Sequence, residues 1–119
     1  MTVSTIDRNP LQLLTQPFSA GAIGIGVTAF NTGWVPVAAY LNGRLRGNAH
    51  QDQTGTLLIE FANDTTDSDL AFTVVQDATQ PNVQYPFDVI ILQRFVRVSF
   101  VNGGVASTFF RANAAVLSI

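Results

Sequence analysis

Apolar and polar side chains alternate along most of this chain, and an alternation at every second residue is typical of strands rather than helices. The clearest case is residues 56–61, in which three large apolar side chains alternate with Leu58 and Glu60 (Leu57, Ile59 and Phe61). Because both faces of this segment carry apolar groups and only Glu60 interrupts them, it predicts a central strand of a sheet. The other strands are expected to pack around it.

The same pattern predicts further strands, separated by turns that are rich in Gly, Asn, Pro and Asp. They are expected at residues 22–30, 34–41, 44–49, 70–75, 85–92, 95–101 and 106–117. Asn42-Gly43 and Asn102-Gly103-Gly104 are typical of tight hairpin turns. Since no segment has a helical period, we expect an all-β fold, an antiparallel β-sandwich or jelly roll of about seven to eight strands.

Residues 1–20 lack a sustained period and contain Pro10 and Pro17, so they predict an extended N-terminal arm, with the β-sandwich domain at residues 21–119. Four apolar side chains of the arm are candidate interface residues: Leu11, Leu13, Leu14 and Phe18. We expect them to be buried against a neighbouring subunit or a larger shell, while the sandwich folds without them. The alternative is an arm that wraps its own domain.

Composition adds a constraint on the surface. The chain has 119 residues, of which 47% are hydrophobic, enough for the core of one domain. Only 12% are charged, compared with roughly 25% in an average soluble domain. An exterior with so few charges favours a homo-oligomer or a member of a larger assembly. The alternative is a monomer with a surface rich in Thr, Asn and Gln.

Charge and cysteine content exclude several classes of function. A net charge of −2 gives no basic surface for nucleic acid. The lack of cysteine removes disulfides, thiolate catalysis and zinc bound by cysteine, and it fits assembly in a reducing cytoplasm. The first residues do not have the pattern of a signal peptide, and no apolar run approaches the roughly 20 residues of a membrane span, so we expect no membrane contact.

Few residues are candidates for chemistry, and we expect no catalytic, metal-binding or cofactor-binding residues and no cofactor. The single histidine, His50, lies beside Asp52 and is interpreted as a solvated loop residue, because no nucleophile motif accompanies it. The carboxylates at residues 63–69 lack the Gly and Glu of a calcium loop and indicate turn chemistry. The chain is therefore not expected to be an enzyme.

Glu60 is the only glutamate, and a glutamate on a covered strand is usually paired with a cation. Arg97 and Arg111 are its natural partners, and we predict a structural ion pair between Glu60 and Arg97 on neighbouring strands. A second hypothesis concerns sugars, which stack on aromatic rings. Trp34, Tyr40 and Tyr85 can form such a platform, although aromatic residues within strands more often belong to a core or an interface.

Two blocks of sequence resemble paired motifs of small β-sandwich modules in structural proteins of tailed bacteriophages. They are the block from Asp52 to Glu60 (DQTGTLLIE) and the block from Arg94 to Gly103 (RFVRVSFVNG). Trp34 and Phe110-Arg111 fit the same order, so the resemblance covers roughly residues 20–119. The start of the last strand, at Gly104 to Phe109, departs from the more polar pattern of these modules.

The resemblance implies a virion structural protein that is made in the host cytoplasm. A single module with an arm is most similar to capsid decoration, or cement, proteins, which bind the outer capsid surface as trimers. The expected partners are therefore further copies of the chain, in a homotrimer, and the major capsid protein. The alternatives are a phage tail, baseplate or host-attachment component and a carbohydrate-binding β-sandwich module.

Overall fold

The computed structural model describes residues 11–12, 18–66 and 71–117, and over these residues the predicted all-β fold is confirmed. One short 3-10 turn, η2 (Ala38–Tyr40), accompanies the strands. The strands are β1 (Leu11–Gln12), β2 (Phe18–Ala20), β3 (Thr28–Asn31), β4 (Val35–Pro36), β5 (Arg44–Gln51), β6 (Gly55–Ala62), β7 (Phe72–Thr79), β8 (Tyr85–Ile90), β9 (Phe95–Asn102) and β10 (Phe110–Leu117).

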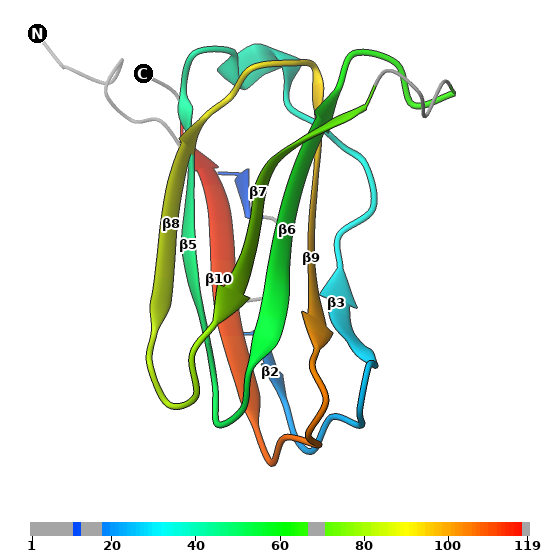
Figure 1. Cartoon of the computed structure of the whole chain (residues 1–119). Helices are drawn as coiled ribbons and strands as arrows, with labels where there is room; N and C mark the ends of the chain where they lie inside the picture. The colour runs from blue at the N-terminus through cyan, green and yellow to red at the C-terminus, as the bar shows by residue number, and fades with distance from the viewer. Residues whose placement is uncertain (1–10, 13–17, 67–70, 118–119) are drawn as a thin grey trace, which may run out of the picture.

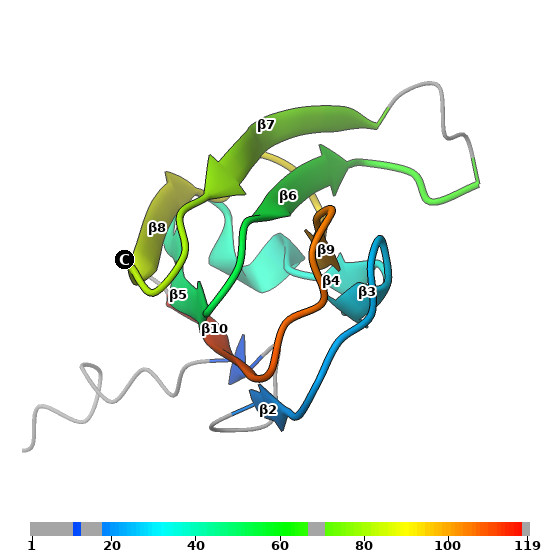
Figure 2. The same ribbon diagram turned by 60° about the horizontal axis from the view of Figure 1, so that its bottom comes forward.

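The strands form two antiparallel sheets that pack face to face (Figures 1 and 2). The first, here called the β5 sheet, has the order β1-β10-β5-β8, and β2 also pairs with β10. The second, the β6 sheet, has the order β3-β9-β6-β7, and β4 also pairs with β9. As its sequence pattern predicts, β6 is a central strand.

The pairing is nested in the manner of a jelly roll. The innermost pair is β6 with β7, the next is β5 with β8, then β3 with β9, and the outermost is β2 with β10. Such nesting arises when one long antiparallel hairpin folds over on itself, and the lateral pairs β5 with β10 and β6 with β9 then close the two sheets. The structure thus selects the jelly roll over other sandwich topologies.

Inward-facing apolar side chains from both sheets fill the core. Leu57, Ile59 and Phe61 of β6 are completely buried, because alternate residues of a strand point to the same face. The ring of Phe100 lies 4.7 Å from that of Phe110, centroid to centroid, and joins the β6 sheet to the β5 sheet. Aromatic pairs at this separation are favourable beyond the area that they bury.

Three predicted strands are much shorter in the structure. The strand expected at residues 34–41 is reduced to β4 (Val35–Pro36), and residues 38–40 form η2 instead. The strand expected at residues 22–30 begins only at Thr28, because the chain turns at Gly26, whose φ is +67°. Of residues 22–27, only Ile23 makes a bridge, to Ser107. The strand expected at residues 106–117 likewise begins at Phe110, and residues 103–109 form a connection.

The two Asn-Gly turns do not form hairpins. β4 belongs to the β6 sheet and β5 to the β5 sheet, so Asn42-Gly43 follows η2 in a crossing between the sheets. Asn42 has the positive φ of +67° expected for such a turn, but a local turn does not decide which sheet the next strand joins. In the same way, the connection after Asn102 crosses from β9 to β10.

Part of the predicted arm pairs with its own domain. Leu11 is the register partner of Val116, and Phe18 is the register partner of Ala112, so β1 and β2 form the edge of the β5 sheet beyond β10. Val116 and Ala112 are on the core side of β10, where they are buried. Leu13 and Leu14 lie outside the described residues.

A buried amide ties together the connections at the lower end of the sandwich in Figure 1. The side-chain nitrogen of Asn102 donates to the carbonyl oxygens of Ile23, Gly24 and Val105 at 2.9–3.1 Å. Its side-chain oxygen accepts a hydrogen bond from Nε2 of Gln51 at 3.0 Å. Both amides are 2% exposed, so these bonds replace hydration that the backbone lost on folding.

Replacing Asn102 tests this cluster. Asn102→Ala leaves buried carbonyls without a donor, and we expect the free energy of unfolding to fall by at least about 2 kcal/mol. Asn102→Asp, which has the same shape but places an acceptor against those carbonyls, is expected to be equally harmful. Chemical denaturation measures both, with Asn31→Ala, at an exposed asparagine, as the control. A loss no larger than that of the control would contradict the role of Asn102.

Deletion of residues 1–20 tests whether β1 and β2 support the sandwich. The deletion removes their ladders with β10, and each lost hydrogen bond costs about 0.5–1.5 kcal/mol. It also exposes the edge of β10 to pairing with other chains. We expect a lower melting temperature and more self-association than in a variant that lacks only residues 1–10. Equal melting of the two variants would show that β1 and β2 add no stability.

Candidate functional site

The outward face of the β6 sheet carries the predicted ion pair. Glu60 of β6 and Arg97 of β9 are register partners, and Nε and Nη2 of Arg97 lie 2.9 and 2.8 Å from Oε1 of Glu60. The guanidinium also stacks on Trp34, with its central carbon 4.4 Å from the ring centroid. Arg111, the other partner considered from the sequence, lies on the β5 sheet.

This pair is not in a covered layer, contrary to what the sequence indicated. Arg97 and Glu60 lie on the face of the β6 sheet that points away from the core, and their side chains are 32% and 16% exposed. Water therefore screens part of their attraction, and the pair stabilises the fold less than a buried pair would. The ring of Trp34 adds a cation–π attraction to the guanidinium that lies over it. The arrangement supports a structural role.

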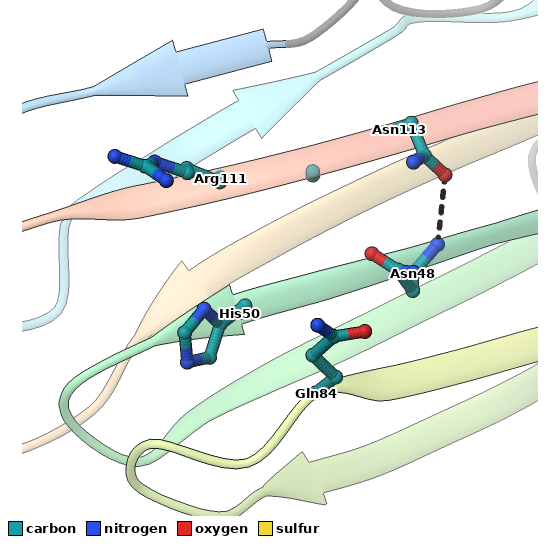
Figure 3. Close-up of a pocket in the computed structure, with 6 residues that line it drawn as sticks. Asn48, His50, Gln84, Arg111 and Asn113 are labelled. Atoms are coloured by element: carbon teal, nitrogen blue, oxygen red, sulfur yellow. Dashed lines mark hydrogen bonds between the residues drawn. The ribbon is translucent and has the colours of Figure 1, made fainter.

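The outward face of the β5 sheet is polar and contains a hollow of about 290 Å³ (Figure 3). Arg111 of β10 is the register partner of His50 of β5, and Asn113 is the partner of Asn48. Gln84, which precedes β8, lies beside them. These residues could not be recognised as one site from the sequence, because they come from three separate segments.

The arginines nearest to this hollow on the same face are already paired. Nε of Arg44 lies 3.0 Å from Oδ1 of Asp88, and Nε of Arg46 lies 3.3 Å from Oδ2 of the same carboxylate. All three side chains are at least 42% exposed. One carboxylate therefore serves two guanidinium groups, and among the described residues this face has an excess of positive charge.

His50 lies on β5 and not in a loop, which corrects the interpretation from the sequence. Its ring and that of Phe109 form a T-shaped pair, with centroids 5.1 Å apart. Asp52 does not pair with it, because Asp52 accepts hydrogen bonds from the backbone N–H and the hydroxyl of Thr108 at 3.0 and 2.7 Å. The bond from the Thr108 hydroxyl holds the pKa of Asp52 below its ordinary value.

The remaining carboxylates do not gather into a metal site within the described residues, where no group of three or more His, Asp or Glu side chains occurs. Asp64 accepts hydrogen bonds from the backbone N–H and the hydroxyl of Thr66 at 2.8 and 2.7 Å. These bonds, the one from the hydroxyl first, lower the pKa of Asp64. This is turn chemistry, as predicted for the part of the loop that the structure describes.

The three aromatic residues of the sugar-platform hypothesis do not share a surface. Trp34 stacks on Arg97 at the β6 sheet, whereas Tyr40 and Tyr85 pack against the core. A platform made of these three rings is therefore not formed. In the part of the chain that the structure describes, no helix has the length and apolar character needed to span a membrane.

The fold and its two outward faces define a small antiparallel jelly-roll module. Comparison with known families places it further: residues 20–116, most of the chain, match the family described as "Uncharacterised protein YqxG N-terminal domain", and the chain belongs to this family. No curated protein matches the chain.

Among solved structures, the chain is similar to the crystal structure of the PBSX exported protein XepA, with a TM-score of 0.56 and 19% sequence identity. The similarity covers 94% of this chain but only 35% of XepA, so the chain spans about a third of that protein. At this identity the similarity concerns the fold.

A double-mutant cycle with Glu60→Gln and Arg97→Gln measures the ion pair. Because both side chains are partly exposed, we expect a coupling of roughly 0.5–1.5 kcal/mol, smaller than the roughly 3–5 kcal/mol lost when a buried pair is broken. The pair of Arg44 and Asp88, whose side chains are each 42% exposed, is the more exposed control and should couple more weakly. Purely additive effects for Glu60 and Arg97 would show that their contact adds no stability.

Proposed function

We propose that this protein is a non-enzymatic structural component of a tailed bacteriophage particle, and more specifically a capsid decoration, or cement, protein. Three observations support the proposal: the resemblance of its sequence blocks to phage structural modules, its fold similarity to the PBSX exported protein XepA, and its jelly roll, a topology that viral capsid domains also use. Its place of action would be the outer surface of the virion.

The observation that carries the assembly role is an apolar tip on two connections, residues 21–27 and 103–109, which lie at the lower end of the sandwich in Figure 1. The tip consists of Ile25, Val27 and Val105, whose exposed fractions are 67%, 50% and 57%. Scattered exposed apolar residues are ordinary, but a cluster at one end of a domain is typical of an interaction site.

The tip is held in shape by backbone hydrogen bonds between its two loops. Gly26 donates to the carbonyl oxygen of Gly103 at 3.1 Å, and Asn102 donates to that of Val27 at 2.9 Å. The side chain of Asn102 binds the carbonyl oxygen of Val105 from the other side. Because the loops are fixed before binding, contact with a partner costs little conformational entropy.

Burial of one tip against a partner gives a modest affinity, which increases when several tips of a symmetric oligomer bind together. Each large aliphatic side chain contributes about 1.5–3 kcal/mol when it is fully buried, before the costs of association. Three copies in a homotrimer would bind the three-fold positions of a shell together, which raises their combined affinity. The partners in this proposal are further copies of the chain and the major capsid protein.

Val105→Asp tests the tip. The new carboxylate cannot be buried without a cation, so self-association and binding to capsids should fall at least about tenfold while melting is unchanged. Light scattering and co-sedimentation with phage heads measure the two effects. Leu92→Asp, at an exposed leucine (52%) in the connection between β8 and β9 at the opposite end of the sandwich, is the control.

Two results would contradict the proposal. If Val105→Asp binds heads as well as the wild type, the tip is not the contact. If the wild-type protein sediments with isolated tails and not with heads, it is a tail or baseplate component and not a decoration protein.

A further inference from the structure

Several hydrogen-bond donors face the hollow of the β5 sheet, formed by Asn48, His50, Gln84, Arg111 and Asn113 (Figure 3). We propose that this hollow binds an acidic carbohydrate, with the carboxylate of a uronic-acid unit at Arg111 and the sugar hydroxyls at the amide side chains. This site is separate from the apolar tip and does not depend on the assembly role.

The orientation of one amide shows which groups are available. The backbone N–H of Asn48 donates to Oδ1 of Asn113 at 3.1 Å. Only the oxygen of an amide accepts a hydrogen bond, so this contact fixes the orientation of the Asn113 side chain. Its NH₂ group has no hydrogen-bond partner among the described residues and is available to a ligand, two residues along the same face of β10 from Arg111.

Charge favours an anion at this place. Among the described residues, Arg111 has no carboxylate within ion-pair distance, whereas the other two arginines of this face share Asp88 (Arg44 and Arg46). A guanidinium group donates two parallel hydrogen bonds to a carboxylate, which gives both strength and geometry. An acceptor with negative charge therefore matches Arg111 and the NH₂ group of Asn113.

The size and the remaining side chains of the hollow favour a sugar over a small ion. Its volume of about 290 Å³ is near the lower end of the roughly 300–1,000 Å³ of small-ligand sites. The amides of Asn48 and Gln84 can each donate and accept, as sugar hydroxyls require of their partners. Lectins also use the jelly roll, which shows that this architecture can present a sugar site.

The hollow is built on a rigid base. β5 and β10 are paired on both sides within their sheet, and Phe109 holds the ring of His50 by an edge contact. The loop that carries Phe109 is fixed in turn by the hydrogen bonds from Thr108 to Asp52. A preformed site of this kind loses little freedom when a ligand binds.

Titration of the ¹⁵N-labelled full-length chain with trigalacturonate tests the proposal by NMR. We expect the backbone amide signals of residues 48, 50, 111 and 113 to shift together. The neutral trisaccharide maltotriose and inorganic phosphate are the comparison ligands, and each is expected to bind at least about tenfold more weakly, because it lacks either the charge or the sugar hydroxyls. No shift with trigalacturonate, or equal binding of phosphate, would overturn the proposal.

Three variants locate the binding on the sheet. Arg111→Gln and Asn113→Asp should each weaken trigalacturonate binding about tenfold or more. The second variant keeps the oxygen that accepts from Asn48 but replaces the NH₂ donor by a carboxylate oxygen. Arg46→Gln removes the same charge from the same face outside the hollow and should keep wild-type affinity. Equal losses for Arg46→Gln and Arg111→Gln would show unspecific attraction and refute the site.

Discussion

The side-chain amide of Asn102 is the interaction on which one end of the jelly roll depends. At the lower end of Figure 1, all four connections pass from one sheet to the other, after β2, β5, β7 and β9. A crossing chain leaves the hydrogen-bond ladders and needs other partners for its backbone. Asn102 and its neighbour Gln51 supply these partners. Their side chains donate hydrogen bonds to carbonyl groups in three of the connections. In the fourth connection, the backbone N–H of Asn82 donates a hydrogen bond to the backbone carbonyl of Gln51.

The few charged residues of the chain are unevenly distributed over this scaffold. On the outward face of the β6 sheet, the guanidinium of Arg97 already has two partners, the carboxylate of Glu60 and the ring of Trp34. On the β5 sheet, the outward face has more arginines than carboxylates and a group of amides. The tip between the ends of the sheets is apolar. The three surfaces thus differ in chemistry, and two of them, the outward face of the β5 sheet and the tip, keep groups available for contacts.

Strand positions could be predicted from the sequence because alternation reports directly which side chains face the core. This worked for β6, whose Leu57, Ile59 and Phe61 are buried. It failed for residues 22–27, where alternating Ile and Gly imitate a strand, although Gly26 has the positive φ of a turn. The Asn42-Gly43 turn was found, but the sheet that the chain joins after a turn is decided by long-range pairing.

The hollow could not be predicted from local patterns, because residues 48–50 and 111–113 meet only through the register of β5 with β10. A signal was present in each segment, since both carry polar side chains at two successive outward positions of a strand. The pair of Glu60 with Arg97 was easier to find, because a lone glutamate within an apolar strand requires a partner. The exposure of this pair could not be predicted, because the pattern of β6 is apolar on both faces and does not show which face points outward.

The register of Leu11 opposite Val116 places the two points at which the chain enters and leaves the module next to each other. Such a module can therefore be inserted into a longer polypeptide with little change in the structure around the insertion point. A pulling force applied through the two ends would act on the β1 and β10 pair first. It would break the hydrogen bonds of this pair one after another, in the unzipping geometry. The remaining strands would be loaded only after that pair had opened, so the edge of the β5 sheet would be the mechanical weak point of the module.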